Sequence, residues 1–305
     1  MKQNGSSRAA SVLQSLASVL LCVILFVSFA GGVLLWYCDG WLADPVSHHD
    51  FMQDTAYFDT AAEEIEKAIK VSLSLIPISP EDIIEQLDQT KLYQCSELAA
   101  KENVRKLFGE ESVPVHFEDE NLYRFIDETL LRYSEEQDIV YEQGSSKSVY
   151  DTICDTIDSV LNVINGKSAE VLSGYCAKVK SIASNWYILL IVSLVSLILI
   201  LAVHFKRIAS GIYSAALTLG VSSAFLLAAA HILLEKDYVS KSVLSGGLYG
   251  KLIGGVYRSF FGDMKQCFLI CFCVTVVLFI ASVVLVLCRR GKKDLPAIDT
   301  SDNAS

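Results

Sequence analysis

The side chains most able to do chemistry in this sequence are its five histidines and nine cysteines. The densest group is His48, His49 and Asp50, with Asp54 four residues further on. Imidazole and carboxylate groups could bind Zn²⁺, which takes three or four such ligands. Adjacent histidines point in different directions on most backbones, however, and the group follows Pro45. A solvated polar loop is the simpler interpretation, so we expect no metal and no other cofactor.

Known catalytic motifs do not occur in the sequence. It has no H-E-x-x-H zinc motif, no G-x-S-x-G nucleophile turn and no G-x-x-x-x-G-K-[ST] phosphate loop. His116 follows Pro114 and precedes Glu118, with no nucleophile beside it. We therefore predict no catalytic residues and no enzymatic activity.

Acidic residues gather in short runs, among them Glu118-Asp119-Glu120 and Glu135-Glu136. Such runs could collect Ca²⁺ or a basic partner, but the D-x-D-x-D-G pattern of a calcium loop does not occur. A solvated helical face is the simpler interpretation. The acidic balance also argues against nucleic-acid binding, because such a site needs basic residues opposite the phosphates.

Four stretches without Asp, Glu, Lys or Arg dominate the composition, which is 52% hydrophobic with a mean hydropathy of +0.41. Each has 19 to 25 residues, and about 20 apolar residues cross a bilayer as a helix. They predict an all-α membrane protein, with four transmembrane helices and a large helical extracytoplasmic domain between the first two. The third stretch is rich in small residues, so we expect it to be the most enclosed by protein. The four stretches are 15–38, 186–204, 210–234 and 266–288.

Basic residues indicate the orientation, because they flank the cytoplasmic ends of membrane helices. Residues 1–14, 205–209 and 289–305 hold eight basic and three acidic residues, whereas 39–185 holds 12 basic and 29 acidic ones, a net charge of −17. The loop 235–265 does not follow this rule, because it has five basic residues although it is predicted to lie outside. We predict a multi-pass protein of the cell membrane with both termini cytoplasmic and with 39–185 and 235–265 outside.

The first span has a second interpretation, since Ser28-Phe29-Ala30 resembles a signal-peptide cleavage site. Its apolar run is longer than the about 7–15 residues of a signal peptide, which favours an uncleaved anchor. Trp36, Tyr37 and Trp41 then predict an aromatic belt at the outer face of the membrane.

Segment 39–185 has apolar residues at helical spacing, for example Phe58, Ala62 and Ile65. Ser79-Pro80 predicts a helix start, with Ser as the N-cap and Pro at the first helical position. The last predicted helix runs directly into the second span, which gives one helix of about 55 Å from 168 to 204. The helices expected are 52–75, 80–88, 91–108, 119–142, 147–164 and 168–185.

Four cysteines lie on the predicted outer side, where disulfides can form. Cys154 and Cys176 are nearly equidistant from Asn165-Gly166, which would place them side by side in a helical hairpin. We predict a Cys154–Cys176 disulfide, with Cys38–Cys95 as the remaining, weaker pair. Buried free thiols are the alternative.

Two further features lie around the end of the third span. His231 and Glu235 are four residues apart, so they can form a polar pair on one helical face near the membrane interface. Within 244–262, Gly250 and Gly254 would form a G-x-x-x-G ridge against another helix if the segment is helical. A flexible glycine loop that joins spans three and four is the alternative.

Two functions fit these features. The first is a membrane-anchored extracytoplasmic binding or sensing module. It would act through a partner protein, because the cytoplasmic segments total only 36 residues, too few for a signalling domain. The alternative is a structural or transport-associated membrane subunit, whether monomeric or oligomeric. The expected partners are the lipid bilayer and a protein in the membrane or outside it.

Overall fold

The structure is a computed structural model, and the regular elements that it describes are all helical, as predicted. They fall into two compact units, each described by itself below. The apolar unit is built from described parts of 1–40, 181–235 and 261–305, and the polar unit from described parts of 41–180 and 236–260. The described residues are 3–48, 52, 56–74, 76–142, 144–164, 167–239 and 246–291.

Four helices supply the apolar unit, and each is long and apolar enough to span a membrane. This finding confirms the four predicted apolar helices, whereas their position in a membrane and the placement of a domain outside it stay predictions. Helices α1 and α11 each continue without a break into the polar unit. The elements are α1 (Gln3–Ala43), α9 (Trp186–Val203), the 3₁₀ turn η2 (Phe205–Arg207), α10 (Ile208–Lys236) and α11 (Gly247–Gly291).

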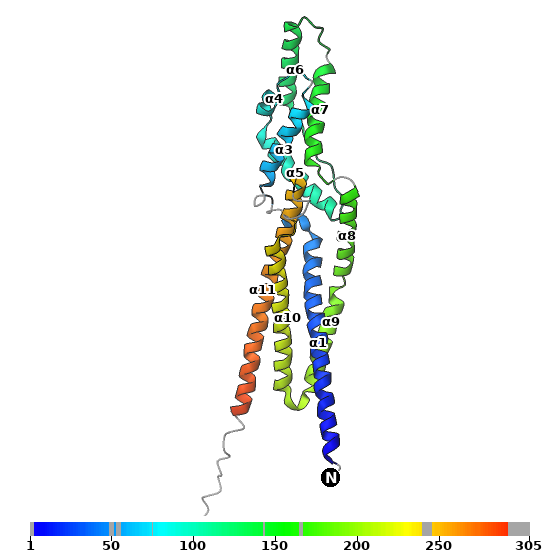
Figure 1. Cartoon of the computed structure of the whole chain (residues 1–305), viewed down its shortest axis with the longest axis vertical. Coiled ribbons are helices and arrows are strands. Elements are labelled where there is room, and N and C mark those ends of the chain that lie inside the picture. The colour runs from blue at the N-terminus through cyan, green and yellow to red at the C-terminus, as the bar shows by residue number, and fades with distance from the viewer. Residues whose placement is uncertain are drawn as a thin grey trace, which may run out of the picture. The chain divides into compact units, whose positions relative to one another are not determined.

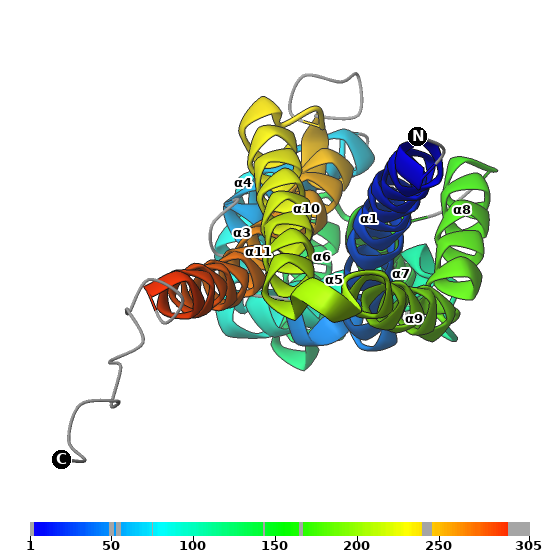
Figure 2. The ribbon, with the colours of Figure 1, turned by 90° about the horizontal axis from the view of Figure 1, so that it is seen from below.

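Glycines bring α1 and α9 together in the apolar unit (Figures 1 and 2). A Cβ added at Gly32 would lie 2.6 Å from Leu190 Cδ2, and one at Gly31 would lie 2.9 Å from Leu189 Cδ1. A Cβ at Gly32 would also lie 3.1 Å from Leu190 Cγ and 3.3 Å from Leu190 N, so the neighbouring helix would have to shift, whereas at Gly31 the end of the Leu189 side chain would have to move. Close packing of small residues is the main attraction between helices in lipid, where burial from water contributes nothing.

Helix α10, the third span, is not the most enclosed helix of the apolar unit. In the most apolar stretch of α1 28% of residues are buried, against 22% for α10. The expectation for α10 was wrong because small residues allow a close approach but do not compel one. Gly220 of α10, for example, has no atom within 4 Å of the place where its Cβ would be.

The polar unit is a helical bundle in which α7 packs against α3 and α6 (Figure 1). Its apolar residues recur at helical spacing, so that Ile65 and Ile69 of α3 and Ile153 and Ile157 of α7 are all fully buried. The elements are the 3₁₀ turn η1 (Pro45–His48), α3 (Tyr57–Ser72), α4 (Pro80–Gln86), α5 (Gln89–Leu107), α6 (Glu120–Glu136), α7 (Gly144–Leu161) and α8 (Lys167–Ala183).

The predicted start at Ser79-Pro80 is confirmed. The Ser79 hydroxyl accepts a hydrogen bond of 3.4 Å from the Asp82 N–H, and Pro80 is the first residue of α4. Both features satisfy or remove backbone donors that have no partner in the first helical turn.

The segment 247–260 is helical rather than a loop, and it belongs to the polar unit. Leu248 and Leu252 of α11 are fully buried there. The Leu248 N–H donates a hydrogen bond of 2.9 Å to Glu64 Oε1 from α3. Gly247 precedes it with φ +65°, and a Cβ at Gly247 would lie 2.5 Å from the same oxygen. Glycine is therefore required where α11 begins.

Gly250 and Gly254 are both buried in this part of α11. At Gly254 the nearest neighbour is the side chain of Val239, 3.9 Å from the position of an added Cβ. That is an ordinary contact and not the tight approach of a second helix. The ridge formed by this glycine pair stays a prediction, and Gly254 gives it no support.

The predicted continuous helix from 168 to 204 is interrupted. Helix α8 ends at Ala183 and α9 begins at Trp186, with a turn at Ser184-Asn185 between them. The Asn185 N–H bonds to the Ile182 carbonyl three residues back, at 3.2 Å, instead of four. Apolar periodicity alone did not reveal this turn, because the pattern continues across it.

The predicted Cys154–Cys176 disulfide is not present, and both residues are free thiols. Cys154 is buried on α7, while α8 continues onward from the end of α7 instead of folding back along it (Figure 1). The antiparallel hairpin that would have brought the two cysteines together therefore does not form. Cys38 and Cys95 are free as well.

Candidate functional site

Residues 110–119, which we call the strap, form an extended segment between α5 and α6 without a turn or bend. Val115, Phe117 and Asp119 are buried, whereas His116 and Glu118 between them are exposed. This period of two is that of a β-strand, although no second strand lies beside the strap within the described part of the chain. The buried apolar side chains dock the strap on the helices beneath it.

Side chains of α7 and of Asn162, the residue directly after α7, take the place of a partner strand. The Phe117 N–H donates to Asp158 Oδ1 at 2.7 Å, and the Val115 N–H donates to Asn162 Oδ1 at 3.1 Å. Asn162 Nδ2 returns a bond of 3.0 Å to the Val115 carbonyl. Four residues along a helix rise about 6 Å, close to the about 6.6 Å that two residues span in a strand. The two spacings match, so consecutive turns of α7 reach alternate residues of the strap.

The ends of the strap are held in the same way. The Val113 N–H donates to Glu102 Oε2 of α5 at 3.0 Å, and the Asp119 N–H donates to the Tyr150 hydroxyl of α7 at 2.8 Å. Four alternate N–H groups are therefore satisfied by side chains. This arrangement removes the cost of about 1–3 kcal/mol for each buried donor that would otherwise lack a partner.

Cys154 lies on the face of α7 that holds the strap, one turn from Tyr150 and one turn from Asp158. Burial raises the pKa of its thiol to about 11, because a thiolate loses its hydration there.

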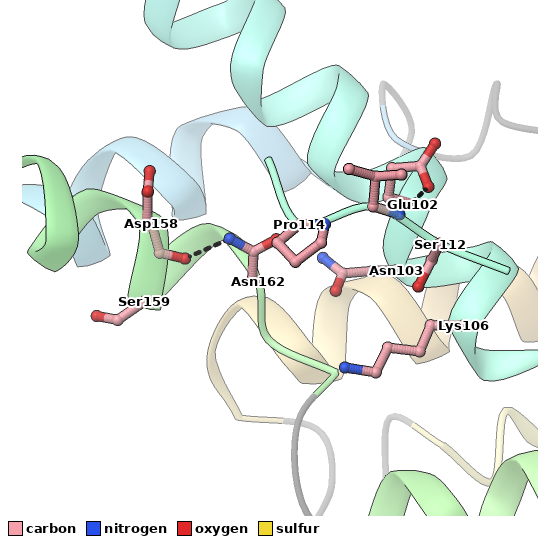
Figure 3. Close-up of a pocket in the computed structure, with 9 residues that line it drawn as sticks. Glu102, Asn103, Lys106, Ser112, Pro114, Asp158, Ser159 and Asn162 are labelled. Carbon is pink, nitrogen blue, oxygen red and sulfur yellow. Dashed lines mark hydrogen bonds between the residues drawn. The ribbon is translucent and has the colours of Figure 1, made fainter. Parts of the chain in front are cut away.

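A cleft of about 380 Å³ lies between α5, the strap and the end of α7 (Figure 3). Its lining carries both signs of charge, from the Glu102 and Asp158 carboxylates and the Lys106 ammonium. Pro114 forms part of the wall on the strap side. The complete lining is Glu102, Asn103, Lys106, Ser112, Val113, Pro114, Asp158, Ser159 and Asn162.

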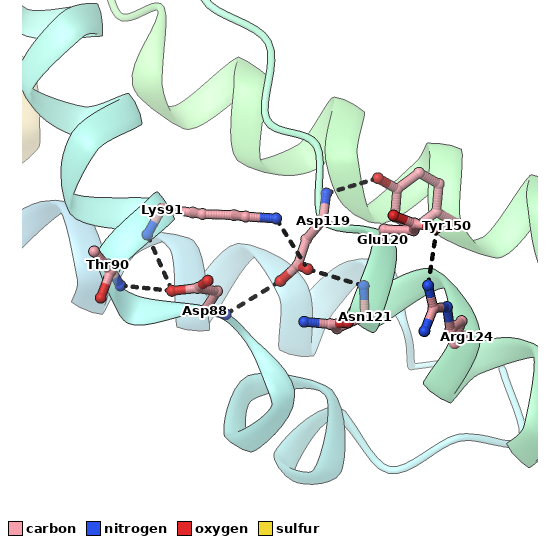
Figure 4. A network of polar contacts seen from close by, with 8 residues as sticks. All are labelled: Asp88, Thr90, Lys91, Asp119, Glu120, Asn121, Arg124 and Tyr150. Atoms are coloured by element: carbon pink, nitrogen blue, oxygen red, sulfur yellow. Dashed lines mark hydrogen bonds and ion pairs between the residues drawn. The ribbon is translucent and has the colours of Figure 1, made fainter.

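Asp119 anchors the far end of the strap, with no exposed surface at all (Figure 4). Its carboxylate accepts bonds from the Asn121 N–H at 3.1 Å and the Asp88 N–H at 3.3 Å, and Lys91 Nζ lies 3.6 Å away. It thereby caps α6 and ties α6 to the start of α5, where helix dipoles favour a negative charge. The solvated face expected for Glu118-Asp119-Glu120 therefore holds for its outer residues and was wrong for Asp119.

Helix α5 leads from the cleft to an aromatic cluster around Trp41, all within the polar unit. Phe108, directly after α5, packs edge-on against Trp41 at 5.6 Å between ring centroids. Phe260 of α11 packs edge-on at 5.0 Å, and His48 stacks on the indole at 4.9 Å. Trp41 is only 4% exposed, so it packs inside the polar unit, and the interfacial aromatic belt stays a prediction to which this residue gives no support.

The structure brings together one of the residue pairs singled out from the sequence. His231 Nε2 lies 3.1 Å from Glu235 Oε1, and both side chains are exposed at the end of α10. Their position at a membrane interface stays a prediction. His116, which had no evident partner in the sequence, has its Nδ1 2.8 Å from Asp158 Oδ2.

The candidate metal group from the sequence is only partly described. His48 stacks on Trp41, whereas His49, Asp50 and Asp54 lie outside the described residues. Among the residues that are described, no three His, Cys, Asp or Glu side chains form a group that could hold a metal ion.

The strap and its anchors were missed in the sequence. One signal was available, since Val113, Val115 and Phe117 alternate with Pro114 and His116 in the pattern of a half-buried strand. The anchors Asp158 and Asn162 gave no local signal, because they lie more than 40 residues from the backbone groups that they bind.

Comparison with known protein families, curated proteins and solved structures finds no match to this chain. The functional argument therefore rests on the geometry of the cleft, the strap and the aromatic cluster.

Proposed function

We propose that this chain is a membrane-anchored extracytoplasmic module that binds a small polar ligand in the cleft and passes the bound state to a partner protein in the membrane. A cleft of about 380 Å³ lies within the roughly 300–1,000 Å³ of small-molecule sites. Lys106 and the remaining lone pairs of the Glu102 and Asp158 carboxylates fit a zwitterion such as a free amino acid or a dipeptide, although these carboxylates also bind Arg105, His116 and the backbone of the strap. Binding rather than catalysis is proposed, because Asp158 already uses its two carboxylate oxygens to hold His116 and the Phe117 N–H.

The observation that carries this proposal is the packing of Trp41. Helix α5 supplies one wall of the cleft and leads to Phe108, which contacts Trp41 near the end of α1. Trp41 in turn contacts Phe260 of α11, and both α1 and α11 are continuous with helices of the apolar unit. A ligand that shifts α5 would alter this cluster. This route replaces transmission through the interrupted helix 168–204.

The orientation is supported by the charge of 39–185, which is −17, against the basic flanks of both termini. Thiol labelling of intact cells tests it, with Ser145→Cys or Ser301→Cys introduced into a version that lacks the nine native cysteines. A membrane-impermeant reagent should modify Cys at 145 directly and Cys at 301 only after permeabilisation. The opposite result would place the polar unit in the cytoplasm and overturn the proposal.

Ligand binding is tested with Trp41 as the reporter. The chain has three tryptophans, so Trp36→Phe with Trp186→Phe leaves Trp41 as the sole emitter. In lipid nanodiscs, titration with free amino acids and dipeptides should raise the melting temperature and change Trp41 emission saturably for at least one compound.

Two lysine variants show whether that response comes from the cleft. Lys106→Met should weaken it, while Lys147→Met, an equal charge change at an exposed position on α7, should not. If no compound changes either the melting temperature or the emission, a zwitterionic ligand is excluded. Stabilisation without any change in emission would contradict coupling through Trp41.

A further inference from the structure

The strap has a second edge, which faces away from the side chains that hold it. In an extended chain the N–H and C=O groups of successive residues point to opposite sides. The N–H groups of Val115 and Phe117 are satisfied by α7. His116 and Glu118 therefore direct their backbone groups the other way, where no described residue forms a hydrogen bond with them.

We propose that this free edge is a docking site for an extended, basic peptide segment of a partner protein, which adds to the strap as a β-strand. In such strand addition, main-chain hydrogen bonds supply affinity and the side chains beside them supply specificity. The bonds here would use the C=O of Pro114 and both backbone groups of His116 and Glu118.

The strap is already held in the conformation that a partner strand requires. Hydrogen bonds to Glu102, Asn162, Asp158 and Tyr150 fix alternate residues along its length. The buried side chains of Val115 and Phe117 prevent it from rotating. An edge that is ordered before binding loses little conformational entropy when the partner arrives.

Charge identifies the kind of partner. Glu111, Glu118 and Glu120 are exposed along the strap and just after it, in a segment whose net charge is −17. A basic side chain of the incoming strand would face Glu118, which lies with His116 on the exposed face of the strap. Glu111 and Glu120 lie beyond the two ends of the paired range and would attract basic residues that flank it. A second copy of the strap is disfavoured as the occupant, because it would set like charges opposite one another, which destabilises paired strands.

Pro114 restricts where pairing can occur. It has no N–H, so a partner strand can pair continuously only from the Pro114 carbonyl to Glu118. Proline at a free strand edge also limits uncontrolled edge-to-edge association. The geometry thus favours a short, specific peptide segment over aggregation.

This docking site does not depend on whether the cleft holds a ligand. The proposed function is overturned if Trp41 does not respond to any ligand. The docking proposal is judged only by the peptide-binding measurements. Each can therefore be overturned without the other.

The test uses the full chain in nanodiscs of neutral phosphatidylcholine, with empty nanodiscs as the control for lipid binding. The probe is a fluorescent heptapeptide of alternating lysine and valine, and its affinity is read from anisotropy. A second peptide carries N-methyl groups on alternate backbone amides, so it keeps the charge but loses the donors on one edge. A third replaces each lysine with glutamate.

We expect the lysine–valine peptide to bind, and either the loss of backbone donors or the reversal of charge to weaken it by about tenfold or more. Equal binding of the methylated peptide would show attraction by charge alone and overturn strand addition. Absence of binding by the lysine–valine peptide would overturn the proposal outright.

Charge-reversal variants locate the site on the protein. Glu111→Lys with Glu118→Lys should abolish binding of the basic peptide, whereas Glu135→Lys with Glu136→Lys, an identical charge change at exposed positions near the end of α6, should preserve most of it. An equal loss of affinity in both variants would mean that the peptide responds only to the net charge of the protein. Dimers cross-linked strap to strap through Glu118→Cys would assign the edge to a second copy and contradict the proposal.

Discussion

In the polar unit, Asp158 and Asn162 bind backbone N–H groups that lie 41 and 47 residues away in sequence. In the apolar unit, Ser196 and Ser222 bind carbonyls four residues back in their own helices, each at 2.8 Å. The first kind of bond determines which segments lie together. The second satisfies a hydroxyl inside an apolar environment, where an unpaired polar group is costly, but selects no neighbour.

The two units therefore depend on different properties of the sequence. The strap is held in place by the chemical identity of a few polar residues, because each anchor must present an acceptor at the right height along its helix. The packing of α1 against α9 depends instead on the shape of the helix surfaces. Gly31 and Gly32 leave room for Leu189 and Leu190, where a side chain would collide. Substitutions should consequently fail by different mechanisms in the two units.

The largest effect should come from removing the main anchor of the strap. Asp158→Ala leaves the Phe117 N–H without its acceptor and His116 without its partner. We expect the polar unit to lose about 3 kcal/mol of stability, because bonds to charged groups are worth about 1.5–3 kcal/mol each. Thermal unfolding of the full chain in nanodiscs measures this loss. Asp155→Ala, an exposed neighbour on α7, should cost far less, and equal costs would refute the anchoring role.

A somewhat smaller effect should follow from filling the contact between α1 and α9. Gly32→Leu forces the new side chain into Leu190 and should destabilise the apolar unit by about 1–3 kcal/mol, the usual cost of overpacking. The matched control is Gly220→Leu on α10, where the position of the Cβ is open, and this variant should unfold like the parent. If both variants unfold at the same temperature, the close contact at Gly32 does not contribute to the stability of the apolar unit.

The smallest effect concerns a reaction rate and not stability. Burial raises the pKa of the Cys154 thiol from 9.0 to about 11, so at pH 8 its thiolate fraction falls about 100-fold. In a chain whose other cysteines are replaced, maleimide should label Cys154 far more slowly than the exposed neighbour in Asp155→Cys. Asp158→Ala should accelerate labelling of Cys154 by loosening the strap. Rapid labelling in the parent chain would mean that the strap does not cover this face of α7.

The helices of both units could be predicted from the sequence because their signals are local. Apolar runs identified the four long helices, and Ser79-Pro80 identified the start of α4. The Cys154–Cys176 bridge failed because it required a relation between two helices, which depends on how α8 leaves the end of α7. Equal distance from a turn is not evidence that the chain reverses there.

The candidate site was missed for the same reason. The alternation of Val115, His116 and Phe117 was present in the sequence, but a single strand among helices has no partner to predict. Nor does any local pattern reveal that Glu64 accepts the Leu248 N–H from 184 residues away. Contacts of this kind follow from packing in three dimensions.

The central claim is that the backbone groups on one edge of the strap are hydrogen-bonded and those on the other edge are free. Hydrogen exchange of the strap at single-residue resolution tests this claim most directly. The account predicts slow exchange for the N–H groups of Val115 and Phe117 and fast exchange for those of His116 and Glu118. Asp158→Ala should release Phe117 first. Uniform protection along the strap, or uniform fast exchange, would contradict the account.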